Sequence, residues 1–289
     1  MIVAEGKTVG SDTRLRLDLS YDGTDFAGWA VQPGLRTVAG TLGEALATLL
    51  RGRVPLVVAG RTDAGVHAAG QVAHIDVEPG ALQNLSPRRS VDPDPPLVGL
   101  LRRLAGLLPA DVRVREINRA PAGFDARFSA LRRHYRYRIA TSSWGADPLD
   151  RVGVLARPRP LDAPRMQRAA EALVGLHDFA AFCRPRVGST TIRDLQELTV
   201  LQHDEQVVIE VAADAFCHSM VRSLVGALIG VGEGRLEVED PARLLAARSR
   251  TAAVHTAAPG GLTLVRVDYP PDAELAARAE ATRALRTGQ

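Results

Sequence analysis

The connection from Ala59 to Gly70, AGRTDAGVHAAG, carries side chains able to do chemistry between two segments with strand character. The apolar, β-branched run VPLVVA precedes it, and the alternating run QVAHIDV follows. Hairpin loops use about two to five residues, so this connection is longer than a turn requires. Asp63 stands between Gly60 and Gly65, which relieve backbone strain and allow close approach of a ligand. Its carboxylate has the chemistry of a nucleophile or a general base.

Two further polar side chains lie in the same connection. Arg61, two positions before Asp63, is expected to stabilise an ionised neighbour. We interpret His67 as a structural hydrogen-bonding residue rather than a base, because no second acid or nucleophile lies at a suitable spacing. An aspartate in a loop also serves as an Asx-turn or capping residue. That structural interpretation of Asp63 stays open at this point.

The segment RRHYRYR interleaves basic and aromatic residues. Strand alternation places Arg133, Tyr135 and Tyr137 on one face. It places Arg132, His134, Arg136 and Arg138 on the other face. Two interpretations fit: an edge strand protected by charge, or a nucleic-acid surface on which arginines bind phosphates and rings stack on bases.

The run AFCHSMVRSLVGALIGVG, residues 215–232, predicts a mostly apolar and largely buried helix that contains Arg222. A guanidinium in such surroundings needs a carboxylate partner or a water-lined cleft. A side chain that reaches along the surface to water is the alternative. Asp63 is the candidate partner, and we expect the two residues to form an ion pair across a cleft.

The elements that position these residues follow one order twice, β-α-β-β-α-β. The first copy has strand 13–21, helix 37–52, strands 54–59 and 71–77, helix 96–107 and strand 111–118. The second copy has strand 130–140, helix 163–175, strands 192–201 and 206–213, a helix from near Phe216 and strand 262–269, with extra helical residues at 240–249. This order predicts an α+β fold of two RRM-like or ferredoxin-like halves, joined edge to edge with a cleft between them.

The predicted organisation has four parts. Residues 1–12 form a disordered N-terminus, 13–120 and 121–270 form the two halves, and 271–289 form a helical or frayed tail. Residues 79–95 form a Pro-rich, Arg-containing loop, and HDFAAF (177–182) is a packing and capping segment without chemistry.

Composition limits the class of protein. The 289 residues are 46% hydrophobic, enough for a substantial core, and the formal net charge is +3. Of 36 basic residues only Lys7 is a lysine. Arginine forks suit phosphates and stack on bases, although a coding bias explains this usage equally well. Cys183 and Cys217 predict neither a disulfide framework nor a metal site.

No targeting or cofactor motif is evident. The first residues lack the pattern of a signal peptide and no window predicts a membrane span, so a cytoplasmic location is expected. We find no P-loop, dinucleotide fingerprint, zinc pattern or serine elbow. An enzyme of this kind must work with side chains alone.

The motif AGRTDAGVHAAGQVAH closely resembles the catalytic motif of the tRNA pseudouridine synthase A family. YDGTDFAGW, FDARFSALRRHYRYRI, FCHSMVRSLVGALIGVG and GLTLVRVDYP resemble that family in its own order, from about residue 13 to 270. The resemblance implies the pseudouridine synthase fold, in which two RRM-like halves form one mixed central sheet around a catalytic cleft. It makes Asp63 the catalytic aspartate, Tyr135 the tyrosine that stacks on the target base, and Arg222 the arginine paired with the aspartate.

The resemblance also implies the reaction. Family members isomerise uridine to pseudouridine in the anticodon stem-loop of tRNA, at positions 38, 39 and 40. They act as homodimers and need neither cofactor nor metal. The aspartate opens and rejoins the glycosidic bond, and the sequence leaves open whether it acts as nucleophile or as proton-abstracting base.

Two positions depart from the family's pattern, and two other functions were considered. Ala30 follows GW where many relatives carry Gln, and Asp125 stands where His is common, which places local RNA contacts in doubt. A non-catalytic RNA-binding protein of two RRM-like units would leave Asp63 and the buried Arg222 without a purpose. A carboxylate-dependent hydrolase would need a second acid nearby, which the sequence does not offer.

Overall fold

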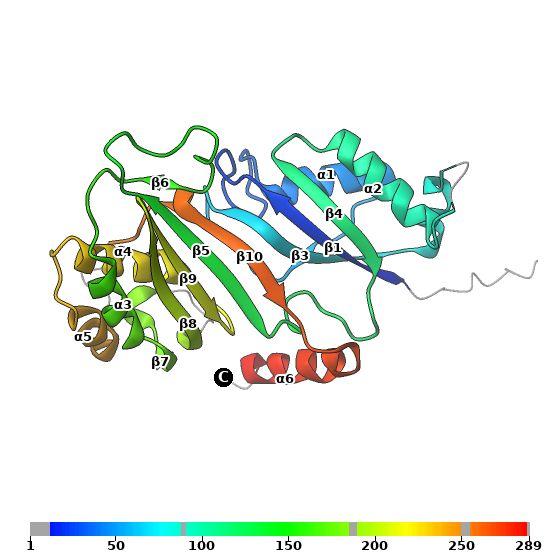
Figure 1. Ribbon diagram of the computed structural model, residues 1–289. Coiled ribbons are helices and arrows are strands. Elements are labelled where there is room, and N and C mark those ends of the chain that lie inside the picture. The colour runs from blue at the N-terminus through cyan, green and yellow to red at the C-terminus, as the bar shows by residue number, and fades with distance from the viewer. Residues whose placement is uncertain (1–11, 88–90, 185–189, 250–254, 288–289) are drawn as a thin grey trace, which may run out of the picture.

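The computed structural model describes residues 12–87, 91–184, 190–249 and 255–287 (Figure 1). The predicted disordered N-terminus falls outside the described residues except for its last position. The first half contains β1 (Thr13–Tyr21), α1 (Val38–Leu50), β2 (Val57–Val58), β3 (His67–Val77), α2 (Pro95–Leu107) and β4 (Val112–Arg119). The second contains β5 (Arg132–Ala140), β6 (Leu155–Ala156), α3 (Ala163–Glu171), β7 (Gly175–Asp178), β8 (Ile192–His203), β9 (Gln206–Ala213), α4 (Met220–Gly232), α5 (Asp240–Ala247) and β10 (Leu262–Asp268). The tail forms α6 (Leu275–Thr287), and short 3₁₀ turns are η1 (Pro79–Leu85), η2 (Ala180–Phe182), η3 (Pro259–Gly261) and η4 (Asp272–Glu274).

One mixed sheet runs through both halves, in the order β4-β1-β3-β10-β5-β9-β8-β7. Figure 1 shows its strands side by side, with α1 and α2 at one end and α3, α4 and α5 at the other. The first half places its fourth, first and third strands in the row β4-β1-β3, with its second strand β2 on β3. The second half repeats this order as β10-β5-β9-β8. The predicted α+β fold of two βαββαβ halves is therefore confirmed.

The two halves join where β3 pairs with β10. This pairing is parallel and short, Thr263 with His67 and Leu264 with Ala68. Because β1 lies along one edge of β3, β10 must share the other edge with β2, which pairs at Val57 and Val58. The predicted strand 54–59 is only two residues long. Residues 59–66, which follow it, lie at the junction of the halves.

Several predicted boundaries differ from the structure. Helix α4 begins at Met220 rather than near Phe216, because Ser219 has a left-handed backbone conformation with φ of 62°. The predicted helix 163–175 ends at Glu171, and β7 follows it. The predicted loop 79–95 contains η1, whose Leu82 and Leu85 are buried.

The buried side chains of both halves form one continuous apolar cluster. The tail is part of the packed structure, since Leu275 and Ala279 of α6 are each 2% exposed. In the described ranges, no helix is both long and apolar enough to cross a membrane.

Candidate active site

The carboxylate of Asp63 lies in the connection between β2 and β3, opposite the start of α4. Its side chain is 28% exposed. Three groups face it: Arg222 Nη1 lies 3.5 Å from Oδ2, the Ser219 hydroxyl donates to Oδ2 at 3.3 Å, and His218 Nε2 lies 3.6 Å from Oδ1. Asp63 of the first half thus faces His218, Ser219 and Arg222 of the second half across the junction.

Arg222 is held in place independently of Asp63. Its Nε donates to the carbonyl of Ala257 at 2.8 Å, and the Ala257 amide donates back to the Arg222 carbonyl at 2.9 Å. The predicted ion pair is present, and the alternative of an arginine reaching out to water is wrong, since its side chain is only 18% exposed. The 3.5 Å separation is longer than the roughly 2.7–2.9 Å of a tight charge-assisted bond. The guanidinium therefore stabilises the carboxylate while leaving it open to a further partner.

The N-terminal end of α4 adds to this stabilisation. A helix carries partial positive charge at its N-terminus, and that charge favours a nearby anion. Ser219 is the N-cap, with φ of 62° and ψ of 9°, and such strained positions concentrate at functional sites. Sequence reasoning missed both His218 and Ser219. The available signal was a serine directly before the apolar run, where N-caps occur.

Arg61 does not join this group. Its side chain is exposed, and among the described residues it makes no ion pair or hydrogen bond with Asp63. The expectation that Arg61 stabilises Asp63 therefore has no support in the structure. Near Asp63, Arg61 and Ala64 are exposed, whereas Thr62 is buried, with only 6% of its surface exposed.

Tyr135 lies on β5 and is 9% exposed. Its ring packs edge-on against Phe216, with centroids 5.2 Å apart and planes at 88°. Burial raises the pKa of Tyr135, and the proximity of Tyr21 and of the Asp63 charge raises it further. The phenol consequently stays protonated at neutral pH and lies within electrostatic range of the carboxylate.

The other polar residues of β5 are engaged by the protein itself. β5 lies between β10 and β9, so the edge-strand interpretation is wrong. On its outer face Arg136 pairs with Glu210 and Arg138 with Asp150, both at 2.7 Å. On the inner face Arg133 is 7% exposed and donates to the carbonyl of Ala59 at 2.8 Å. Arg133 therefore holds the start of the Asp63 connection.

Asp125, one of the two departures from the family pattern, is buried and 6% exposed. It accepts from the amides of Arg127 and Phe128, both at 2.8 Å, and from Arg283 at 2.7 Å. Burial acts to raise the pKa of Asp125, but these bonds and nearby His74 outweigh it and hold the pKa below its usual value. Asp125 thus has a structural role in this fold.

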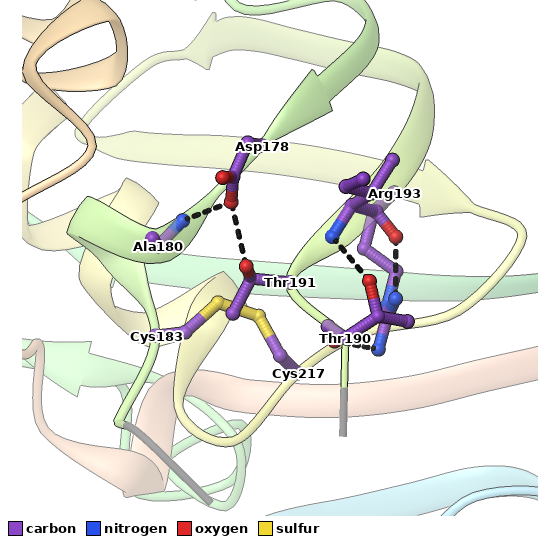
Figure 2. Close-up of a disulfide and its surroundings, with 8 residues drawn as sticks. Asp178, Ala180, Cys183, Thr190, Thr191, Arg193 and Cys217 are labelled. Carbon is purple, nitrogen blue, oxygen red and sulfur yellow. Dashed lines mark hydrogen bonds between the residues drawn. A yellow bond between two sulfur atoms is a disulfide. The ribbon is translucent and has the colours of Figure 1, made fainter. Parts of the chain in front are cut away.

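The two cysteines are joined, which the sequence did not predict. Cys183 and Cys217 form a disulfide with Cα atoms 5.7 Å apart (Figure 2). A separation of 34 positions gives no sign of this pairing; it arises because η2 and the segment before α4 pack together. Beside it, Asp178 accepts from the Ala180 amide and the Thr191 hydroxyl. The predicted packing role of segment 177–182 is confirmed, since Phe179, Ala181 and Phe182 are buried. Cys217 directly precedes His218.

Comparisons with known proteins agree with one another. A family model described as tRNA pseudouridine synthase matches residues 169–270. The tRNA pseudouridine synthase A of Mycobacterium leprae is 55% identical over 96% of this chain and 97% of its own length. The enzymes of that name from Frankia casuarinae and Leifsonia xyli are 58% and 54% identical, over 94% and 95% of this chain and 95% and 98% of their own lengths.

Solved structures resemble this chain only weakly. The archaeal box H/ACA sRNP Nop10-Cbf5 complex aligns with a TM-score of 0.30 and 10% identity, over 74% of this chain and 44% of that one, a likeness too low to carry an argument. The identities of more than half across nearly the whole length are sufficient. This chain belongs to the tRNA pseudouridine synthase A family.

Proposed function

We propose that this protein isomerises uridine to pseudouridine in the anticodon arm of tRNA, at positions 38, 39 and 40, with Asp63 as the catalytic residue. One observation carries the proposal: the Asp63 carboxylate faces Arg222 and the N-terminal end of α4 at the junction of the two halves. Such an acid has a cation beside it and remains partly exposed to solvent. Family membership supports the reaction type.

The reaction needs little beyond such an acid. Uridine and pseudouridine differ in whether C1′ of the ribose bonds to N1 or to C5 of the same base. The enzyme breaks the C1′–N1 bond, turns the base and forms the C1′–C5 bond, after which C5 loses its proton and N1 ends with one. Atoms are conserved, so no cofactor is required. Asp63 acts either as the nucleophile at C1′ or as the base that takes a sugar proton.

Tyr135 is proposed to receive the target base. A base inside a helical stem must leave its stack before an enzyme reaches its glycosidic bond. Tyr135 is 9% exposed and its ring lies beside Phe216 on the second half; the flipped base is proposed to stack on its remaining exposed part. Arg222 is proposed to keep Asp63 ionised in the enclosed complex, because an adjacent cation opposes the effect of desolvation. Arg61 is exposed, and no catalytic role is proposed for it.

We also propose that the protein acts as a cytoplasmic homodimer without a cofactor, as the resemblance implies. Light scattering at the assay concentration should then give a mass near twice 30.9 kDa. A mass of one chain in the active protein would contradict the dimer without affecting the proposed chemistry.

The alternative of a non-catalytic RNA-binding protein is not favoured. It gives no role to an acid placed between a half-buried arginine and a helix N-terminus. The two proposals make different predictions for one assay. We expect purified protein to form pseudouridine in an unmodified tRNA with uridines at positions 38–40, and to form none when those positions carry cytidine. Binding of the first tRNA without any pseudouridine formation would support the alternative.

A further inference from the structure

The side-chain contacts of Asp63 are too long to fix its orientation. Its three partners lie 3.3, 3.5 and 3.6 Å from its oxygens, whereas hydrogen bonds that restrain a group are nearer 2.7–3.2 Å. The direction of the carboxylate must therefore come from the backbone that carries it. The contacts that hold residues 60–65 in place therefore set this direction.

A buried group of three polar side chains lies directly beneath this segment. Tyr21 at the end of β1, Thr62 in the connection, and Gln71 on β3 are 4%, 6% and 0% exposed. The Tyr21 and Thr62 hydroxyls lie 2.8 Å apart, and the Gln71 amide donates to the Tyr21 hydroxyl at 3.1 Å. Because Gln71 supplies that proton, the Tyr21 proton is free to be donated to Thr62.

Both donors of the Gln71 side-chain amide are used, and its oxygen accepts one hydrogen bond. Its Nε2 also donates to the carbonyl of Gly60 at 2.9 Å, and its Oε1 accepts from the amide of Val72 at 3.2 Å. Burial raises the pKa of Tyr21 to about 12, so its hydroxyl stays protonated. Each of these three side chains has at least one buried hydrogen-bond partner, and such buried networks rigidify the segment that they join.

This network holds the chain on the N-terminal side of Asp63, and backbone bonds complete the restraint. Gln71 binds Gly60, Tyr21 binds Thr62, and the amide of Trp29 donates to the carbonyl of Thr62 at 3.1 Å. On the other side the amide of Gly65 donates to the carbonyl of Phe26 at 3.2 Å. The motif YDGTDFAGW, which the catalytic chemistry leaves without a role, therefore lies against the Asp63 connection.

We propose that Tyr21, Thr62 and Gln71 are positioning residues for the isomerisation: their buried hydrogen bonds set the direction in which Asp63 presents its carboxylate. This inference rests on the proposed function. It predicts that weakening the network displaces the carboxylate while leaving the RNA-binding surface intact. A displacement of about 1 Å at a reacting group costs up to about 100-fold in rate.

The test compares variants that differ by a single hydroxyl group, using single-turnover pseudouridine formation, tRNA binding and thermal unfolding. Tyr21→Phe and Thr62→Val each remove one hydroxyl at nearly constant shape. We expect each to lower the rate about 10- to 100-fold while the Kd for tRNA changes by less than about twofold. Thr62→Ser keeps the hydroxyl and should retain a near wild-type rate.

Tyr269→Phe is the matched control. The Tyr269 hydroxyl donates to the Ala126 carbonyl at 2.6 Å, a bond that is not part of the network beneath Asp63. The variant should lower Tm as Tyr21→Phe does without lowering the rate. The proposal is overturned if the folded Tyr21→Phe and Thr62→Val proteins keep the wild-type rate, or if Tyr269→Phe loses as much rate as they do. Should Tyr21→Phe not fold, Thr62→Val against Thr62→Ser decides alone. Inactive wild-type protein would instead contradict the proposed function.

Discussion

The two halves share one strand order but differ in the connection between their second and third strands. That connection is a closed hairpin in one half and leaves the sheet in the other. In the second half, twelve-residue β8 pairs with β9 up to His203 and Gln206, and Asp204 and Glu205 close the hairpin. In the first half, β2 stops after two residues. The connection that follows leaves the sheet and carries Asp63.

The difference follows from the edge that each third strand has available. β8 lies along the whole of β9, so that hairpin has no reason to open. β3 shares its second edge between β2 and β10. Where β10 of the second half pairs with β3, the chain of the first half leaves the ladder. Its backbone packs against residues 21–29 instead. The first half thus carries the candidate site where the second half replaces its own strand pairing along β3.

The comparison predicts that the released connection tolerates much less change than other surface loops. Gly28→Ala is the sharpest case, since an added Cβ would lie 2.9 Å from the Thr62 carbonyl oxygen and φ is +95°. We expect a stability loss of roughly 3 kcal/mol, and a rate loss beyond that caused by unfolding. Gly34→Ala is the control, with φ of +71° but no atom within 4 Å, and should cost about 1–2 kcal/mol. Equal losses in both variants would show that the contact with the connection is unimportant.

Breaking the contact across the junction should have the next largest effect. Arg222→Ala should lower the isomerisation rate about 100-fold. It should cost about 2 kcal/mol of stability, less than for a fully buried pair because solvent reaches Asp63. Urea unfolding of Arg222→Ala, Asp63→Asn and the double variant gives the coupling. If the two stability losses simply add, the residues do not act as partners.

Substitutions of Tyr135 separate stacking from proton transfer. If stacking is its role, Tyr135→Phe should keep the single-turnover rate within about threefold while Tyr135→Ala loses at least about tenfold, since stacking on a base is worth about 1–3 kcal/mol. If its hydroxyl moves a proton, Tyr135→Phe should bind tRNA normally and fail in turnover. Wild-type rates in both variants would exclude Tyr135 from the site.

The smallest effect is expected in the hairpin of the second half. Asp204 has φ of 49° and is exposed, a conformation that glycine adopts more readily. Asp204→Gly should raise stability by about 0.5 kcal/mol and leave the rate unchanged. A loss of pseudouridine formation in this variant would contradict the contrast between the two connections.

The elements were predictable because they follow from local patterns. Alternation in TRLRLDLSY gave β1 at its observed bounds, 13–21, and the repeated order gave the two halves. What failed depended on single residues that the alternation pattern does not weigh. The strand expected at 54–59 is reduced to Val57–Val58, and the residues lost from it include Pro55, which has no amide to donate to a ladder. The start of α4 is delayed to Met220 by the left-handed backbone of Ser219.

The site was predictable in part for the same reason. The apolar surroundings of Arg222 implied a carboxylate partner, and the glycine-flanked Asp63 supplied one. Arg61, chosen for its closeness in sequence, is exposed, and no hydrogen bond or ion pair joins it to Asp63 among the described residues. His218 and Ser219 were missed because, unlike Arg222, neither places a charge inside an apolar helix pattern that would call for a partner. The Cys183–Cys217 disulfide was missed because no local pattern links two cysteines that are 34 positions apart.

The central claim is that the carboxylate in the released connection performs the isomerisation. The most direct test is tritium release from tRNA labelled at C5 of uridine, because forming the C1′–C5 bond expels that hydrogen. Tritium release and tRNA affinity are measured in parallel for wild type and Asp63→Asn. We predict that the amide lowers the rate at least about 1,000-fold with affinity nearly unchanged, since phosphate contacts dominate binding. Release by Asp63→Asn at a near wild-type rate would contradict the account.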